Sequence, residues 1–181
     1  AIDFAIDPSD GVTLATAIRE KGIRFDWKQS PPAVHLGGED MSQRIRDLDV
    51  SGVVSIVAQQ PEVREVLVEQ QRSICKLHPL LVTEGRDQGS VVFPEALVRF
   101  FLEAEVKERT RRRVKQLRRA GNTVEDEIIQ RDIESRDKLD SSRADGPLTC
   151  PEGAIIINTS ALSKDEVVDA MESEVTSRLQ R

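Results

Sequence analysis

The chain has 181 residues, of which 38% are hydrophobic and 32% charged, and its formal net charge is −6 at pH 7. These proportions are typical of a folded globular domain and exclude a wholly disordered chain. No run approaches the ~18 apolar residues of a membrane span, and the acidic balance disfavours a general nucleic-acid binder. Cys75 and Cys150 form no Cys-x-x-Cys pair, and no basic, apolar leader opens the sequence. We therefore expect a cytoplasmic protein from a reducing compartment.

The first third of the chain predicts two helices and a small antiparallel hairpin. A turn at residues 8–11 precedes a short helical stretch through Leu14 and Ile18. Residues 23–27 and 34–36 alternate apolar with polar side chains, as the two strands of a hairpin do. Apolar residues at helical spacing over 62–76, after Pro61, predict one amphipathic helix.

Three short apolar segments alternate with helical stretches in the rest of the chain. Residues 80–83, 98–102 and 154–157 are the expected strands, and this order predicts a parallel sheet covered on both faces. The last helix begins at a capping box, Ser163 with Glu166, and its apolar residues recur every four positions.

A strongly basic helix is expected between the second and third strands. It ends at Gly121, and a second helix runs from near Thr123 to Asp140. Both are poor in large apolar residues, so we expect the pair to form a movable lid. The cations either handle anions or belong to a solvated face with acidic partners, and composition leaves both interpretations open. The cations are Lys107, Arg109, Arg111, Arg112, Arg113, Lys115, Arg118 and Arg119.

Two further patterns suit phosphate and sugar chemistry. Arg136, Asp140 and Arg143 are spaced by four and three residues, so they share one face if the helix continues that far. Such a set could bind a sugar phosphate, although salt-bridge stripes of this spacing are common. Arg86 and Asp87 follow the first apolar segment, where ligands bind in open α/β sheets. An ordinary glycine turn with a local ion pair is the alternative.

The two histidines, His35 and His78, have no His or Cys companion at ligand spacing. No protein-bound metal is therefore expected, and no Ser-His-Asp arrangement can be proposed.

Taken together, these motifs resemble bacterial-type cytidylate kinases over almost the whole chain and in the family's order. The resemblance is carried by the loop Gly85-Arg86-Asp87-Gln88-Gly89-Ser90-Val91-Val92-Phe93-Pro94, the triplet of Arg136, Asp140 and Arg143, Gly146-Pro147-Leu148, and Asn158-Thr159-Ser160. Upstream, Leu36-Gly37-Gly38-Glu39-Asp40, the Ser55 segment and residues 61–72 also agree.

The resemblance implies the α/β, three-layer fold of P-loop nucleoside monophosphate kinases, with a parallel sheet, an NMP-binding insertion and a helical lid. It divides the chain into an NMP-binding region with the hairpin (1–78), core strands and loop (79–106), lid helices (107–146), and a core strand with the C-terminal helix (147–181). It implies transfer of the γ-phosphoryl group of ATP, with Mg²⁺, to CMP or dCMP in pyrimidine nucleotide metabolism. A monomer is expected, with no membrane or nucleic-acid partner.

The resemblance also assigns roles by position. Ser55 and Arg64 match the residues that read the cytosine ring, and Asp87 matches the acceptor of its exocyclic amine. Arg86 matches an arginine near the phosphate, and Arg136 with Asp140 matches the ribose site. Arg112 and Arg113 match the lid arginines that close over the phosphoryl group in transfer. Arg143 matches an arginine that clamps phosphate.

The chain departs from the family most clearly in the phosphate-binding loop. A P-loop contains a Gly-Lys dipeptide, and none occurs in these 181 residues. We expect the strand, loop and helix of that motif, on the order of 30 residues, to be a segment missing upstream of Ala1, without which the chain lacks a phosphate cradle for catalysis. Smaller departures are Glu84, Gln88 and Ser90, where the family more often has aspartate, methionine and threonine.

Two other functions remain as alternatives. One is another nucleoside monophosphate kinase acting on UMP as well as CMP. The other is a non-catalytic module that binds nucleotides or RNA through residues 107–119. The net charge and the 3% of aromatic residues count against RNA, which favours stacking platforms and a basic field.

Overall fold

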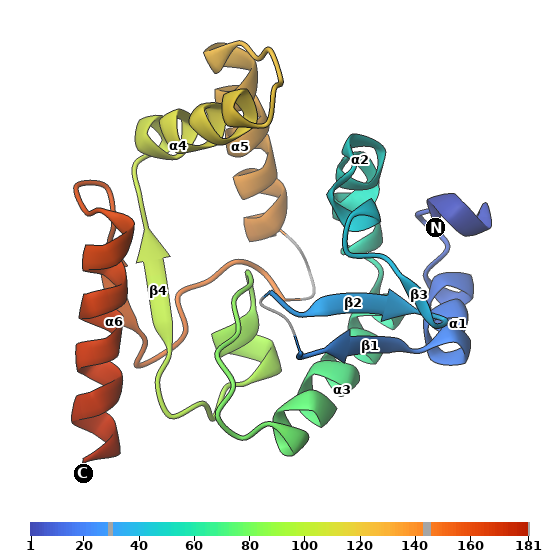
Figure 1. Ribbon diagram of the computed structural model, residues 1–181, viewed down its shortest axis with the longest axis horizontal. Helices are drawn as coiled ribbons and strands as arrows, with labels where there is room; N and C mark the ends of the chain where they lie inside the picture. The colour runs from blue at the N-terminus through green and yellow to red at the C-terminus, as the bar shows by residue number, and fades with distance from the viewer. Residues whose placement is uncertain (29–30, 143–145, 181) are drawn as a thin grey trace. The chain divides into compact units, whose positions relative to one another are not determined.

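The structure, a computed structural model, describes residues 1–28, 31–142 and 146–180. The chain divides into two compact units, Ala1–Val82 and Thr83–Arg181. Figure 1 labels their helices and strands. Within the described ranges, no helix has both the length and the apolar content needed to cross a membrane.

Two packed helices form the core of the first unit. Helix α1 (Gly11–Lys21) begins where the Asp10 carboxylate accepts a hydrogen bond of 3.0 Å from the Thr13 backbone N–H. Helix α3 (Pro61–Leu77) begins at its proline, and the two helices pack against each other. Leu14 and Ala15 from α1 and Val63 and Val66 from α3 are buried. Both predicted helices are confirmed.

The predicted hairpin region of the same unit forms a three-stranded antiparallel sheet. Strand β1 (Ile23–Asp26) pairs with β2 (Ala33–Leu36), as predicted, and β2 also pairs with the short β3 (Glu39–Asp40). Gly37 and Gly38 connect β2 to β3 with φ angles of +62° and +91°, which side chains with a Cβ rarely adopt. The unit also contains η1 (Ile2–Phe4), η2 (Arg44–Arg46) and α2 (Leu48–Val57).

The second unit contains a two-stranded parallel sheet. Strand β4 (Phe100–Glu103) pairs in parallel with β5 (Ile155–Asn158), so two of the three predicted strands and their direction are confirmed. Leu102 and Ile156 remain 51% and 57% exposed, so cover of the sheet is incomplete within the described residues. Helix α6 (Lys164–Leu179) follows β5, and its predicted capping box is present.

Two helices that pack against each other lie between the strands in sequence. Helix α4 (Val106–Arg119) follows β4 and packs against α5 (Asp126–Ser142), as Figure 1 shows. The buried residues of this pair include Thr110 and Val114 of α4 and Ile129 of α5. The predicted helix pair is confirmed, with the second helix beginning at Asp126 instead of near Thr123. Movement of this pair as a lid stays a prediction.

The prediction of a strand over residues 80–83 is wrong. This segment has no strand assignment, and Leu80 and Val82 are 94% and 90% exposed. A strand needs a neighbour for its backbone N–H and C=O groups, and no described strand pairs with this segment. Apolar composition alone therefore predicted a strand that has no partner in the described part of the chain.

Candidate active site

The loop after Val82 turns sharply to present Arg86 and Asp87. It passes directly into η3 (Gln88–Val92), a single π-helical turn, in which the Val91 and Val92 N–H groups donate to the Asp87 carbonyl at 2.9 and 3.2 Å. Val92 is 1% exposed and anchors the turn. A Cβ on Gly89 would lie 3.0 Å from the Pro151 ring, so a larger residue here would press on that ring. The loop geometry is therefore fixed by packing directly after Asp87.

Five charged side chains of the second unit form a chain of alternating sign. The Arg109 Nη1 atom lies 2.6 Å from Asp137 Oδ2, and Arg86 Nη1 lies 4.0 Å from Asp137 Oδ1. Arg86 Nε also lies 3.3 Å from Asp140 Oδ2, and Arg136 Nε lies 3.8 Å from the same oxygen. Arg86 is thus held between two carboxylates, one of which it shares with Arg109 and the other with Arg136.

The helical repeat of α5 explains why both carboxylates face Arg86. Asp137 and Asp140 are three residues apart, so they occupy one face of the helix. The Asp140 side chain is only 5% exposed, whereas those of Arg86 and Arg136 are 40% and 54% exposed. Burying a carboxylate costs free energy unless cations lie beside it, so the two arginines stabilise the charge of Asp140. Both arginines are partly exposed, so some of their N–H donors face solvent. Such a group can bind phosphate oxygens and sugar hydroxyls.

The predicted lid arginines, Arg112 and Arg113, are neighbours on α4 but have different surroundings. Arg112 donates to the Thr159 hydroxyl at 3.1 Å, to the Thr159 carbonyl, and to the Leu162 carbonyl at 3.2 Å. Its Nε also binds Glu108 at 2.7 Å. Arg113 is exposed and donates to the Gln116 side chain instead. In this conformation Arg112 joins α4 to the β5–α6 connection, and Arg113 faces solvent.

The Glu108 carboxylate forms ion pairs with two arginines, Arg111 and Arg112. Hydrogen bonds from Arg111 and then from Arg112, at 2.7 Å each, lower the pKa of Glu108 to about 2. The carboxylate is therefore ionised at any pH near neutrality, and it keeps the orientation of both guanidinium groups.

Comparison with known proteins identifies the family. The family model described as cytidylate kinase matches residues 1–177. A cytidylate kinase from Caldanaerobacter subterraneus subsp. tengcongensis is 43% identical over 164 residues, which are 91% of this chain and 71% of that protein. One from Sodalis glossinidius is 40% identical over 91% of this chain and 71% of its own, and one from Nocardia farcinica is 36% identical over 96% and 75%. The chain belongs to the cytidylate kinase family.

The residues that the resemblance assigns to this family's site are distributed over both units. Ser55 on α2 and Arg64 on α3 are half-buried and belong to the first unit. In the second unit, Arg86 contacts Asp140, which also contacts Arg136, and Asp87 lies beside Arg86 in the loop. Among the described residues, neither Arg112 nor Arg113 forms a hydrogen bond or ion pair with this cluster, and Arg143 lies outside the described residues.

In the first unit, one arginine bound by three aspartates fixes the start of the helix that carries Ser55. Arg44 binds Asp3 at 2.7 Å, Asp47 at 3.0 Å and Asp49 at 2.7 Å. The hydrogen bond from Arg44 lowers the pKa of Asp49 to about 2. The contacts tie η1 and η2 to the first turn of α2.

The sequence analysis missed two members of the charged chain, Asp137 and Arg109. Asp137 could have been found, because it lies three residues before Asp140 on the same helical face. Arg109 gave no such signal, since its contact with Asp137 depends on how α4 packs on α5. Thr159 belongs to the motif Asn158-Thr159-Ser160, which assigns it no role, yet it is 6% exposed and accepts a hydrogen bond from Arg112.

The described residues supply no group of three or more His, Cys, Asp or Glu side chains that could hold a metal ion. Glu84 is one exposed carboxylate at the start of the loop. Mg²⁺ in phosphoryl-transfer enzymes is bound by one or two carboxylates together with substrate phosphates and water, so Glu84 could supply one ligand and the ATP phosphates the others.

Proposed function

We propose that this protein transfers the γ-phosphoryl group of ATP to CMP or dCMP, giving ADP with CDP or dCDP. The observation that carries the proposal is the match to the cytidylate kinase model across residues 1–177. The grouping of Arg86, Arg136 and two carboxylates supports it, because it presents phosphate-binding donors beside hydroxyl acceptors. The cytoplasm, where these nucleotides are available, is the compartment that suits the reaction.

The proposed reaction needs little covalent help from protein. An ionised phosphate oxygen of CMP forms a bond to the γ-phosphorus of ATP, and the bond from that phosphorus to the β–γ bridging oxygen breaks, so ADP leaves. Because the attacking oxygen is already ionised, no general base is required. Catalysis then rests on alignment, charge neutralisation and exclusion of water. Mg²⁺ is proposed to enter bound to the ATP phosphates and to neutralise part of their charge.

The substrate-binding roles follow from side-chain chemistry. We assign the cytosine ring to Ser55, Arg64 and Asp87, whose carboxylate would accept a hydrogen bond from the exocyclic amine. Arg86 is assigned to the CMP phosphate, and Arg136 with Asp140 to the ribose. The ion pairs of Arg86 with Asp137 and Asp140 support this, since they hold its guanidinium in one orientation before substrate binds.

The phosphoryl group in transfer is assigned to Arg112, Arg113 and Arg143. For Arg112 this role requires it to exchange its hydrogen bonds with Thr159 and Leu162 for phosphate oxygens. Among the described residues, Arg113 would give up only its hydrogen bond to the Gln116 side chain. We therefore propose that Arg113 makes the first contact when the helix pair closes.

The test is ADP formation with MgATP and CMP, dCMP, UMP or AMP in parallel. We expect turnover with CMP and dCMP to exceed that with UMP and AMP. ADP formation that does not depend on CMP or dCMP, or that depends equally on all four acceptors, would contradict the proposal.

Asp87→Ala tests the reading of cytosine. A hydrogen bond to a charged group contributes about 1.5–3 kcal/mol, so we expect the preference for CMP over UMP in kcat/KM to fall about 10- to 100-fold. Asp132→Ala, on the exposed face of α5, is the matched control and should keep the preference. An unchanged CMP preference in the Asp87 variant would refute the role of that carboxylate.

A further inference from the structure

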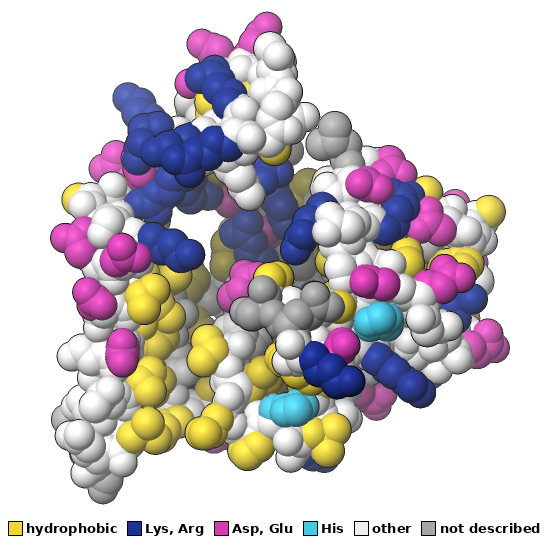
Figure 2. Space-filling view, viewed as in Figure 1, with side chains coloured by type: hydrophobic (Ala, Val, Ile, Leu, Met, Phe, Trp, Pro, Cys, Tyr) yellow, Lys and Arg dark blue, Asp and Glu magenta, His cyan; other side chains and the backbone are white. Residues whose placement is uncertain are grey.

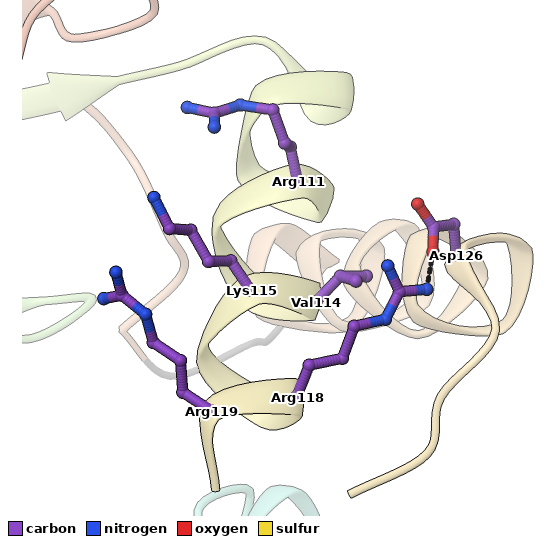
Figure 3. Close-up of a pocket in the computed structure, with 6 residues that line it drawn as sticks. All are labelled: Arg111, Val114, Lys115, Arg118, Arg119 and Asp126. Carbon is purple, nitrogen blue, oxygen red and sulfur yellow. Dashed lines mark hydrogen bonds and ion pairs between the residues drawn. The ribbon is translucent and has the colours of Figure 1, made fainter. Parts of the chain in front are cut away.

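Three cations stand in a row along one side of α4. Arg111, Lys115 and Arg119 are four residues apart, and Figure 3 shows their side chains extending to the same side of the helix. They line a shallow hollow of about 420 Å³ together with Val114, Arg118 and Asp126. Figure 2 shows Lys and Arg side chains gathering over α4. We call Arg111, Lys115 and Arg119 the cation row.

The cation row has little compensation from acidic side chains. Arg111 binds Glu108 at 2.7 Å, and Arg118 beside the row binds Asp126 at 2.7 Å. Within the part of the chain that the structure describes, neither Lys115 nor Arg119 has an acidic partner. Like charges four residues apart disfavour the helix. The helix dipole favours Arg119 in the last turn, but it gives no reason for Lys115 in the middle.

We propose that the cation row binds the phosphate backbone of single-stranded nucleic acid without reading the bases. Four residues of helix rise about 6 Å, so the row presents charges over about 12 Å instead of converging on one point. That arrangement suits a chain of phosphates better than a single phosphate group. This surface is additional to the nucleotide site, and the proposal does not rest on the proposed kinase function.

The other residues around the hollow decide between classes of partner. A protein interface has an apolar or aromatic core, whereas among the described residues the only apolar side chain lining this hollow is Val114, which is 4% exposed. No aromatic side chain lines it either, so bases have no platform on which to stack. Binding through charge alone, with no preference for sequence, is what these residues support.

The net charge of −6 counts against nucleic acid only for the molecule as a whole. At physiological ionic strength, charges more than about 8 Å apart are largely screened from each other. A strand on α4 therefore interacts mainly with the cation row and its nearest neighbours. For this reason the local positive charge of α4 has more weight than the net charge, from which no nucleic-acid partner was expected.

The test is the salt dependence of binding, measured by fluorescence anisotropy with a labelled twelve-nucleotide oligouridylate and with ATP and CMP present. Three single-strand phosphate contacts give a slope of log K against log salt of about −2. We therefore expect binding to be about 10-fold tighter at 50 mM than at 150 mM salt. Lys115→Gln with Arg119→Gln removes two contacts, so the slope should fall to about −0.7 and the salt effect to about 2-fold.

The matched control is Lys164→Gln with Arg178→Gln on α6, which changes the net charge equally at two exposed positions. It should bind like the wild type. An equal loss in the control would overturn the proposal, because net charge alone would then explain binding. So would binding abolished by CMP, a 10-fold preference for oligoadenylate over oligouridylate, or tripolyphosphate binding without oligonucleotide binding.

Discussion

Replacing Asp140 with asparagine is the sharpest test of the charged chain in the second unit. The amide keeps the volume of the side chain but removes the charge that Arg86 approaches at 3.3 Å and Arg136 at 3.8 Å. Two guanidinium groups would then face a neutral group that is 5% exposed. We expect the substitution to destabilise the packing of α5 against the loop that carries Arg86.

The size of the effect follows from distance and exposure. At an effective dielectric constant of 20, each pair has a gross attraction of about 4–5 kcal/mol. The arginine side chains are 40% and 54% exposed, so water screens them and rehydrates them when the charge is lost. A loss of about 2 kcal/mol in the free energy of unfolding remains, close to that of one hydrogen bond to a charged group. For a chain of this size it lowers Tm by about 4–8 °C.

The assay is urea unfolding followed by circular dichroism, with thermal unfolding alongside. We expect the urea midpoint to fall while the m-value stays constant, because the surface exposed on unfolding is the same. Asp132→Asn, exposed on the same helix, should change stability by no more than about 0.5 kcal/mol. If Asp140→Asn were as stable as this control, the ion pairs would contribute nothing net, and the reasoning would be refuted.

Two other contacts give smaller predictions in the same unit. Thr159→Val removes a hydroxyl that donates to the Glu103 carbonyl at 3.0 Å and accepts from Arg112, so we expect a loss of about 1–2 kcal/mol in urea unfolding. A loss smaller than that of an exposed Thr123→Val control would contradict this. Ser163→Ala breaks the capping box of α6 and should cost about 1 kcal/mol at pH 7. Hydrogen bonds from Ser163, first of all from its backbone N–H, hold the pKa of Glu166 below its usual value of 4.5. The stabilisation that the carboxylate gives is therefore present above that value and is lost as the pH falls through the lowered pKa. Alanine at position 163 keeps the backbone N–H that binds this carboxylate, so the variant that tests the linkage is Glu166→Gln. The difference in stability between Glu166→Gln and wild type should shrink in acid, and a constant difference down to pH 2 would exclude the linkage.

Local signals allowed most helices to be predicted from the sequence. Asp10, Pro61 and Ser163 each satisfy or replace a backbone donor at the start of a helix, and all three helices begin there. The strand over residues 80–83 failed because strand formation depends on a partner elsewhere in the chain. Apolar composition gives no information about whether that partner is present.

The same distinction explains which parts of the candidate site could be predicted. The contact of Arg136 with Asp140 follows from helical spacing, and the structure places these side chains 3.8 Å apart. The contacts of Arg86 with both carboxylates join segments that are far apart in sequence. They depend on the packing of the loop against α5, which the residue pattern does not specify.

Helix α4 shows why a run of arginines cannot be interpreted as a single feature. Arg109 points to α5 and pairs with Asp137, while Arg112, three residues later, binds the connection after β5. Lys115 and Arg119 share a third direction, and among the described residues no carboxylate forms an ion pair with either of them. Successive positions on a helix differ by about 100°, so neighbours in sequence meet different environments. Burial and partner, not residue type, therefore separate a structural ion pair, a hydrogen-bonded anchor and a surface able to bind anions.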